Sequence, residues 1–486
     1  MSTASLAQYT ARNPFERSTD IDKPVRPGSM VFDPGRQTMK ISVLGESGKV
    51  AAHWAYRPVK GDFILTAEFG KNELLRPDIS AGWMVRSSIG GDSPEVSAFT
   101  TGEGSTGLRW NRTGATNGKV TGPKRGYSIL QLERAGNTLI MRAAHPGEPL
   151  QEIGSHAAEN LAAELQAGLF VSSTNGEASV TFRNIRIDRP VGDQYDADKD
   201  GHLGSRLELI NIHDRHRMVI HESTGRFEAP NHMPDGKQLL FNQDGSLYTI
   251  PLTGGTPARF NTGKANRNNN DHVISFDGKL LGISHHREGK PGGGSTVYVL
   301  PIDGGEPRLI TEETPSYLHG WSSDNKEVVY VAQRNGNSLY HLYKKRIDGG
   351  PEVQLTFHTE GHVDGPEYSP DGRYIYYNGS QSGTMQLWRM KPDGSGKEQL
   401  TFDERNNWFP HVSPDGRWIA YLSFPSTINP NDHPAYKRVT LNLMPLGGGA
   451  PMVIAYLYGG QGTINVPSWS PDSSTVAFVS NSERSN

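Results

Sequence analysis

Histidines and carboxylates recur at one register in the C-terminal part of the chain, four to seven residues ahead of an Asp that is itself repeated. The residues at this register are Asp271, His272, His319, Asp364, Glu367, His411 and Asn465. Imidazoles beside carboxylates can act as a general base and acid, and the same side chains can bind a divalent metal. Each residue alone is more often a hydrogen-bonded structural group than a catalyst. Their shared register predicts that they converge on a binding or catalytic site.

The repeated Asp lies in a turn between two strand-like runs. The six copies read MPDGKQLLFN, SFDGKLLGIS, SSDNKEVVYV, SPDGRYIYYN, SPDGRWIAYL and SPDSSTVAFV, with Asp235, Asp277, Asp324, Asp371, Asp415 and Asp472 in the turns. The spacing of 42 to 57 residues is close to the period of propeller blades, which have four strands each. The last unit stops after two strands, but residues 205–223 can supply its third and fourth strands and close the ring. Residues 204–486 are therefore predicted to form a six-bladed β-propeller with a shared last blade.

The turns mark the bottom of the propeller, because the first strand of each blade descends along the central channel to its Asp turn. Residues ahead of the first strands and after the second strands then meet at the top face. We expect the catalytic groups there to be His272, His319, Asp364, Glu367 and His411, and the substrate-binding groups to be Asp271, His286, Arg287, Arg334, Trp408 and Asn465. The arginines would hold an anionic group, and Trp408 would stack on a sugar ring. The same loops hold three further histidines, His285, His362 and His433.

The N-terminal part of the chain has a different pattern. From about residue 28 to 188, short apolar-polar alternations are separated by Gly and Asn turns, which predicts a β-sandwich domain over residues 1–190. Only residues 155–166, SHAAENLAAELQ, have a helical pattern. The order GDFILTAEF, AGWMVRSS, LERAGNTLIMRAA, AGLFVSS and FRNIRI resembles concanavalin-like or laminin-G-like jelly-roll domains.

Residues 191–203 are polar and without periodicity, which is typical of a linker. They contain Asp196, Asp198 and Asp200 in a DxDxDG run that offers oxygen ligands to calcium. An EF-hand loop needs Glu at its twelfth position, where this chain has Leu207. A calcium site and a solvated acidic linker are both open interpretations of this run.

Composition excludes several classes of protein. The chain of 486 residues has no cysteine, so neither disulfides nor thiolate nucleophiles are available. A net charge of -3 without a stripe of Lys and Arg disfavours nucleic acid as a partner. No apolar run is long enough for a membrane helix, and the first residues lack the pattern of a signal peptide. We expect a periplasmic or secreted location for the native protein, with a cytoplasmic one as the alternative.

The repeats resemble the TolB-type family of PD40, or WD40-like, propellers at SPDGRYIYY with LWRMKPDG, at SPDGRWIAYLS and at PSWSPDSSTVAFVS. This family resemblance implies the fold and leaves the activity open. Related propellers include the periplasmic Tol-system component, propellers attached to serine peptidases, and oligogalacturonate lyases. The lyase motif, a Gln followed by His-Pro-His ahead of the turn, is not reproduced at NNWFPHVSPDG, where His411 stands alone. No GxSxG elbow is present for a peptidase, and no Walker loop for phosphoryl transfer.

Two functional hypotheses follow. The first is a carbohydrate-active lyase or hydrolase that binds an oligosaccharide at the top of the propeller channel, with or without a divalent metal. In this hypothesis His319→Ala or His411→Ala abolishes turnover without unfolding the chain. The alternative is a non-enzymatic, TolB-like envelope protein that holds a protein partner on the propeller face.

Overall fold

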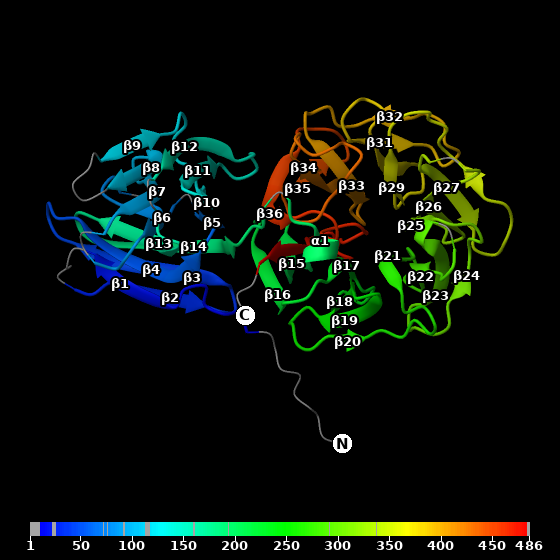
Figure 1. Cartoon of the computed structure of the whole chain (residues 1–486), viewed down its shortest axis with the longest axis horizontal. Helices are drawn as coiled ribbons and strands as arrows, with labels where there is room; N and C mark the ends of the chain where they lie inside the picture. Colours follow the sequence, from blue (N-terminus) through cyan, green and yellow to red (C-terminus); the bar gives the residue numbers. More distant parts are fainter. Residues whose placement is uncertain are drawn as a thin grey trace, which may run out of the picture. The chain divides into compact units, whose positions relative to one another are not determined.

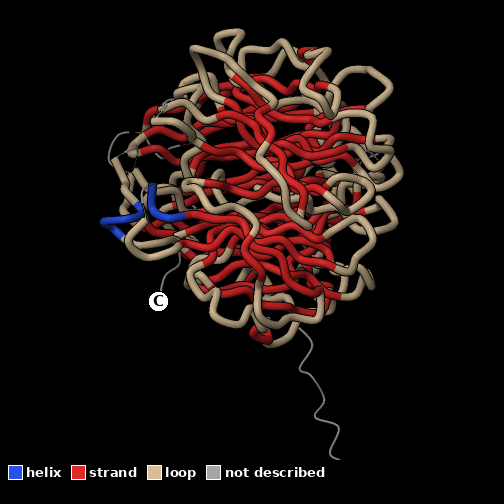
Figure 2. The backbone as a smooth tube through the Cα atoms, turned by 90° about the vertical axis from the view of Figure 1, so that its right-hand side faces the viewer, coloured by secondary structure: helices blue, strands red, loops and turns tan. Residues whose placement is uncertain are grey.

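A computed structural model describes residues 10–483, apart from residues 22–25, 71, 75, 91–92, 112–116, 159–160, 193, 291 and 337. The described residues form two compact units, one of residues 10–195 with 216–218, the other of residues 196–215 with 219–483. Both units are built from strands (Figures 1 and 2). Within the described ranges the only α-helix is α1 (Ala197–Asp200), and one 3-10 turn covers Gly292–Gly294. No helix in these ranges is long and apolar enough to cross a membrane.

The first unit consists of two seven-stranded antiparallel sheets. The first sheet, in order, is β1 (Arg17–Ile21), β4 (Ala51–Lys60), β13 (Glu164–Ser173), β6 (Ser80–Arg86), β7 (Glu95–Thr101), β8 (Thr106–Asn111) and β9 (Gly118–Thr121). The second is β12 (Gln151–Ala157), β11 (Thr138–Ala144), β10 (Ile129–Ala135), β5 (Phe63–Phe69), β14 (Gly176–Asp188), β3 (Thr38–Gly45) and β2 (Ser29–Asp33). One apolar core takes side chains from both sheets, and the Trp83 indole N–H donates to the Leu130 carbonyl across it at 3.2 Å. The predicted sandwich is therefore confirmed, while its relation to jelly-roll domains stays a prediction.

The helix predicted over residues 155–166 is wrong. This stretch ends β12 at Ala157 and begins β13 at Glu164, and residues 159–160 lie outside the described ranges. Strand β13 pairs with both β4 and β6, which places it in the middle of its sheet. Tertiary pairing of this kind overrides the weak helix preference of Ala, Leu and Glu.

The second unit has the six sheets of a β-propeller, and the prediction of a shared last blade is confirmed. Five sheets have four antiparallel strands in chain order: β17 (Glu228–His232), β18 (Gln238–Gln243), β19 (Ser246–Pro251), β20 (Ala258–Arg259); β21 (Asn268–Ile274), β22 (Leu280–His286), β23 (Ser295–Pro301), β24 (Arg308–Leu309); β25 (Ser316–Trp321), β26 (Glu327–Ala332), β27 (His341–Arg346), β28 (Val353–Gln354); β29 (Val363–Tyr368), β30 (Ile375–Gly379), β31 (Gln386–Met390), β32 (Glu398–Gln399); β33 (Asn406–Val412), β34 (Trp418–Phe424), β35 (Lys437–Pro445), β36 (Met452–Gly459). The sixth sheet joins β16 (Arg217–Ser223) and β15 (Gly204–Asn211) to β37 (Thr475–Ser482). Pairing β15 with β37 closes the ring and removes two free sheet edges.

The Asp turns share one hydrogen-bond pattern. In five of the six turns a Ser two residues ahead donates its hydroxyl to the Asp carboxylate at 2.6 to 2.7 Å, from Ser275, Ser322, Ser369, Ser413 and Ser470. In the first turn Met233 occupies the Ser position. Short side-chain to backbone bonds of this kind stabilise turns, so the repeated Asp has a structural role.

Candidate functional site

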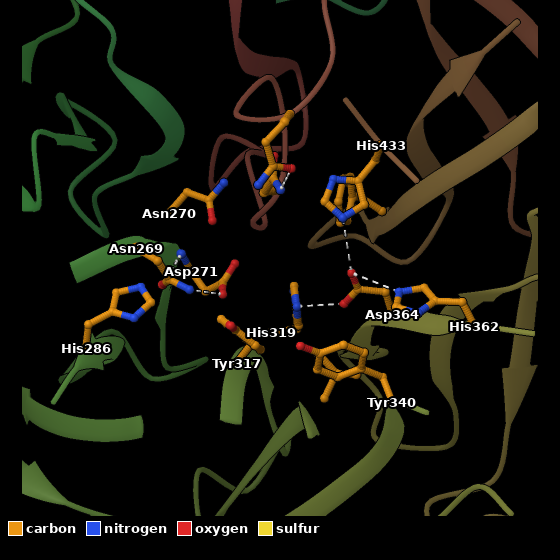
Figure 3. A pocket seen from close by; sticks show the side chains of 14 residues that line it. Asn269, Asn270, Asp271, His286, Tyr317, His319, Tyr340, His362, Asp364 and His433 are labelled. Carbon is orange, nitrogen blue, oxygen red and sulfur yellow. Dashed lines mark hydrogen bonds and ion pairs between the residues drawn. The ribbon is translucent and has the colours of Figure 1, made fainter. Parts of the chain in front are cut away.

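A cavity of about 350 Å³ lies in the propeller unit, and first strands of four successive blades, β21, β25, β29 and β33, contribute to its wall (Figure 3). Its lining residues are Asn269, Asn270, Asp271, His286, Tyr317, His319, Val331, Tyr340, His362, Asp364, Phe409, His433, Gln461 and Asn465. Five of the residues predicted from the sequence are among them: Asp271, His286, His319, Asp364 and Asn465. The shared register ahead of the Asp turns therefore located part of this wall.

The first strands of all five four-stranded blades break their pairing register at the height of the site. The breaks fall between Glu228 and Asn231, Asn268 and His272, Leu318 and Gly320, Asp364 and Glu367, and Trp408 and His411. A β-bulge re-aims the side chains of the residues that it inserts. In the fourth blade the bulge includes Gly365 at φ 56, an αL conformation that glycine adopts without strain. Each bulge shifts the regular alternation of side chains, so a residue ahead of it no longer faces the side that its distance from the Asp turn predicts.

Asp364 is the centre of a cluster of three imidazoles (Figure 3). One of its carboxylate oxygens lies 3.0 Å from Nε2 of His319, and the other lies 3.9 Å from Nε2 of His362 and 3.7 Å from Nε2 of His433. In Figure 3 His319 lies between Asp364 and a second carboxylate, Asp271. The Asp271 carboxylate accepts a hydrogen bond of 2.7 Å from the Asn269 amide.

The surroundings of Asp271 and Asp364 shift the pKa values of these two carboxyl groups in opposite directions. Burial raises the pKa of Asp271 to about 7, against the opposing effect of His319. Burial also disfavours the charge of Asp364, but its ion pair and hydrogen bond with His319 outweigh this and hold its pKa well below the usual value. For His319, burial would lower the pKa, while Asp364 and Asp271 raise it to about 8. Near neutral pH the site combines a carboxyl that can donate a proton with a carboxylate-imidazolium pair.

We expect the His319 ring to titrate near pH 8 in an NMR experiment that follows the imidazole carbon-bound protons. In Asp364→Asn the pKa of the same ring should be lower, because burial is then opposed by Asp271 without Asp364. The pair stabilises the fold below pH 6.5, and this contribution is lost as the pH rises through 8. Asp432→Asn is a control on an exposed carboxylate near the cavity, and an unchanged His319 pKa in Asp364→Asn would contradict the ion pair.

Several residues of the wall were not among the predicted site residues. Tyr317 and Tyr340 contribute two phenols with ring centroids 6.1 Å apart, and Tyr340 packs edge-on against His362. Tyr340 directly precedes the third strand of its blade, so counting back from third strands would have found it. Gln461 and Asn465 are linked by a hydrogen bond of 2.9 Å, and Gln461 lies in the loop before the shared blade.

His411 and Glu367, predicted as catalytic, do not line the cavity. Nδ1 of His411 lies 2.7 Å from the Glu367 carboxylate, and Nε2 lies 2.5 Å from the Ile464 carbonyl oxygen. The other Glu367 oxygen accepts the Val412 amide at 3.1 Å. These bonds connect two successive blades and the segment before the shared blade, so the pair has the contacts of a structural link.

Four other predicted site residues also lie outside the cavity wall. His272 is fully buried, and burial lowers its pKa to about 4, so it is neutral. Trp408 has no exposed surface and packs against His433, which rules out a sugar-stacking role in this structure. Arg334 forms a two-bond ion pair with Glu352 at 2.8 and 2.9 Å, and so its charge is already neutralised. Arg287 is half-buried next to His286 and does not line the cavity.

The described residues contain no group of three or more His, Asp or Glu side chains arranged to hold a metal ion. The divalent metal expected in the channel stays a prediction. For the calcium hypothesis, the Asp196 carboxylate pairs with Lys199 at 2.6 Å, and Asp200 accepts the Asp196 amide at 2.9 Å. The side chain of Asp198 lies outside the described part of the chain.

Comparisons with known proteins agree with the fold. The PD40 family, described as the TolB beta propeller domain, matches residues 321–431. An uncharacterized protein of Agrobacterium fabrum is 45% identical over 280 residues, which are 57% of this chain and 93% of that relative. The solved structure of a putative TolB from Agrobacterium tumefaciens has 44% identity and a TM-score of 0.54, over 58% of this chain and 99% of that one. An oligogalacturonate lyase in complex with manganese is a distant neighbour, at 12% identity and a TM-score of 0.34 over 55% of this chain and 73% of that one, and it has no bearing on the reaction.

The six-bladed ring, the repeated Asp turns and these matches together define a TolB-type propeller protein. The chain belongs to the family of TolB-like PD40 β-propeller proteins.

Proposed function

We propose that the propeller cavity binds a neutral segment of an oligosaccharide and hydrolyses one glycosidic bond in it. The observation that supports this is the pairing of Asp271, whose pKa is raised to about 7, with the ionised Asp364 in one small cavity. Most glycoside hydrolases use two carboxyl groups, one protonated and one ionised. The amides of Asn269, Asn270 and Asn465 add hydrogen-bonding groups suited to sugar hydroxyls.

In the proposed reaction Asp271 donates its proton to the glycosidic oxygen as the bond to the anomeric carbon breaks. The Asp364 carboxylate, held in place by His319, stabilises the positive charge that develops at that carbon. Water supplies the hydroxyl that bonds to the carbon, and its remaining proton returns to Asp271. The products are two sugars with free hydroxyl groups, and the enzyme is unchanged.

Hydrolysis fits this wall better than elimination from a uronic acid. A lyase must neutralise the substrate's carboxylate while a proton leaves the adjacent carbon, which calls for a fixed cation. None of the described residues that line the cavity is Lys or Arg. Arg334, predicted for this role, is paired with Glu352 instead.

A substrate screen tests the proposal. Neutral oligosaccharides should raise the melting temperature of the full chain and be cleaved with release of reducing ends, whereas uronic-acid oligomers should do neither. Cleavage of uronides to unsaturated products, detected by their ultraviolet absorbance, would replace hydrolysis by elimination. Absence of binding and cleavage for every sugar would overturn the assignment.

A second candidate function follows from the family itself. The match to the TolB propeller domain and the similarity to a putative TolB support an envelope protein that holds a protein partner on the propeller. This function also favours a periplasmic location. A pull-down from envelope extracts that enriches one protein, combined with no response to sugars, would support this candidate over the enzyme.

A further inference from the structure

A second cavity, of about 470 Å³, lies in the sandwich unit, at the strands β7, β8 and β9. Its lining residues are Glu95, Arg109, Trp110, Asn111, Asn117, Gly118 and Lys119. The core-facing residues of these strands include Val96, Ala98 and Leu108, so their neighbours Glu95, Arg109 and Lys119 project from the opposite, outer face. The cavity is therefore separate from the apolar core.

Two cations stand opposite each other in this cavity. Arg109 on β8 is the direct cross-strand partner of Lys119 on β9. The Arg109 guanidinium carbon lies 5.2 Å from the ring centre of Phe99 and 5.4 Å from that of Phe170, and the Lys119 ammonium lies 5.0 Å from the ring centre of Phe99. Both rings belong to a buried aromatic cluster with Trp54 and Tyr56. Contacts to aromatic rings hold the two cations at this position.

Among the described residues, no carboxylate lies within ion-pair distance of either cation. The side chains of Arg109 and Lys119 form no hydrogen bond or ion pair with any residue that the structure describes. Glu95 lines the same cavity, but its carboxylate accepts the Ser97 hydroxyl at 2.6 Å and lies beyond ion-pair distance of both cations. Burial lowers the pKa of Arg109, and Glu95 opposes this from a distance. By contrast, Arg142 and Arg183 of the other sheet are each paired with a glutamate.

Like charges directly opposite each other on neighbouring strands destabilise a sheet, and a partly buried guanidinium without an acceptor loses hydrogen bonds that water would give it. A bound anion would remove both costs. We infer that this cavity is an anion-binding site, whose ligand presents a carboxylate, sulfate or phosphate group to the Arg109 guanidinium and the Lys119 ammonium. The planar guanidinium can offer two parallel N–H groups to such an anion, and the amides of Asn111 and Asn117 line the same space.

The anion has two chemical sources, a free inorganic ion and the acidic substituent of a larger saccharide. Titrations of the full chain with sodium sulfate, a sulfated oligosaccharide and its unsulfated counterpart at constant ionic strength separate them. Equal molar affinity for inorganic sulfate and the sulfated sugar identifies the free ion as ligand. A sulfated sugar that binds at least about tenfold more tightly than sulfate, with no binding of the neutral sugar, identifies the substituent.

Substitution of either cation tests the site. Lys119→Gln, an exposed position, and Arg109→Gln should each weaken binding by about tenfold, the usual loss for one charge-assisted hydrogen bond. Lys124→Gln is the matched control, since Lys124 belongs to the same unit and is paired with Glu148 at 3.1 Å. It should bind anions as the unchanged protein does, which also corrects for the general stabilisation that sulfate gives proteins.

Lys119→Glu provides a second, opposite readout. It places a carboxylate across from Arg109, so the melting temperature in anion-free buffer should rise while the response to sulfate disappears. Equal anion binding by Lys119→Gln and Lys124→Gln, or a melting temperature of Lys119→Glu that falls, would overturn the inference. The result is independent of the propeller cavity, because Asp271→Asn should leave anion binding unchanged.

Discussion

Asp271→Asn should lower kcat/KM for the cleaved oligosaccharide by about two to four orders of magnitude, the usual contribution of a general acid. The amide keeps the shape of the side chain and its place in the cavity, but it cannot deliver a proton to the leaving oxygen. Substrate binding should change little, so the loss should fall on kcat. Steady-state kinetics with the best neutral substrate from the screen give both parameters.

The pH dependence of kcat/KM tests whether the loss of activity comes from the missing Asp271 proton. In the unchanged protein kcat/KM should fall about tenfold per pH unit above pH 7, because the acid is active only in its protonated form and its pKa is raised to about 7. Residual activity of Asp271→Asn should lack this limb. Asp277→Asn, in the exposed turn of the same blade, is the matched control and should keep both rate and profile.

The melting temperature of Asp271→Asn shows whether a loss of activity comes from the missing acid or from unfolding. The raised pKa means that ionising Asp271 in the folded state is unfavourable, so its contribution to stability declines as the pH rises from the ordinary value of 3.8 through 7. Asp271→Asn should thus melt at a higher temperature than the unchanged protein at pH 8. Full activity of Asp271→Asn, or a lower melting temperature at pH 8, would contradict the assigned role.

Glu367→Ala should reduce the free energy of unfolding by about 1 to 3 kcal/mol for each buried donor that it leaves without an acceptor. It leaves Nδ1 of His411 and the Val412 amide without the acceptor that both share. Urea unfolding of the full chain measures the change, with the exposed Glu360→Ala in the preceding loop as control. His411→Ala should destabilise the chain in the same direction.

This result would replace the catalytic role expected for His411 and Glu367 from their register. The folded fraction of Glu367→Gln, which keeps an oxygen acceptor, should retain the turnover of the unchanged protein. A Glu367→Ala variant with unchanged stability and no turnover would instead return the pair to catalysis.

The pattern of the sequence was sufficient for the blades. Each Asp turn is stabilised by local hydrogen bonds. In five of the six turns the Asp carboxylate accepts from a Ser hydroxyl two residues before it and from the backbone amide two residues after it, so the turns can be recognised in the sequence without any tertiary contact. The alternation of apolar and polar residues is also a local pattern, so the strands could be predicted from it. The prediction failed at residues 155–166, which include the end of β12 and the start of β13, a strand that pairs with both β4 and β6.

The candidate site could be located by register only in part. Asp271, His319 and Asp364 reach the cavity, whereas His272, on the strand of Asp271, is buried outside its wall. Trp408 and His411 are likewise buried outside the wall, although Phe409 of the same strand lines it. A β-bulge in each first strand shifts the alternation, so the side of the strand that a residue occupies cannot be counted from the turn. From the sequence Arg334 was expected to bind an anionic substrate group, but in the fold it pairs with Glu352. The two residues are 18 positions apart, so this contact could not be predicted from a local pattern.

By itself, the sequence determined the all-β class, the six-bladed ring and the stretch of each blade from which site residues come, since all three depend on short-range patterns that repeat. Only the tertiary structure decided which imidazoles and carboxylates share a cavity and which link the blades. The protonation states of Asp271, His319 and Asp364 also belong to the fold, because they depend on burial and on charges from different blades. The spacing of residues along one strand contains no information on the distances between side chains of different blades.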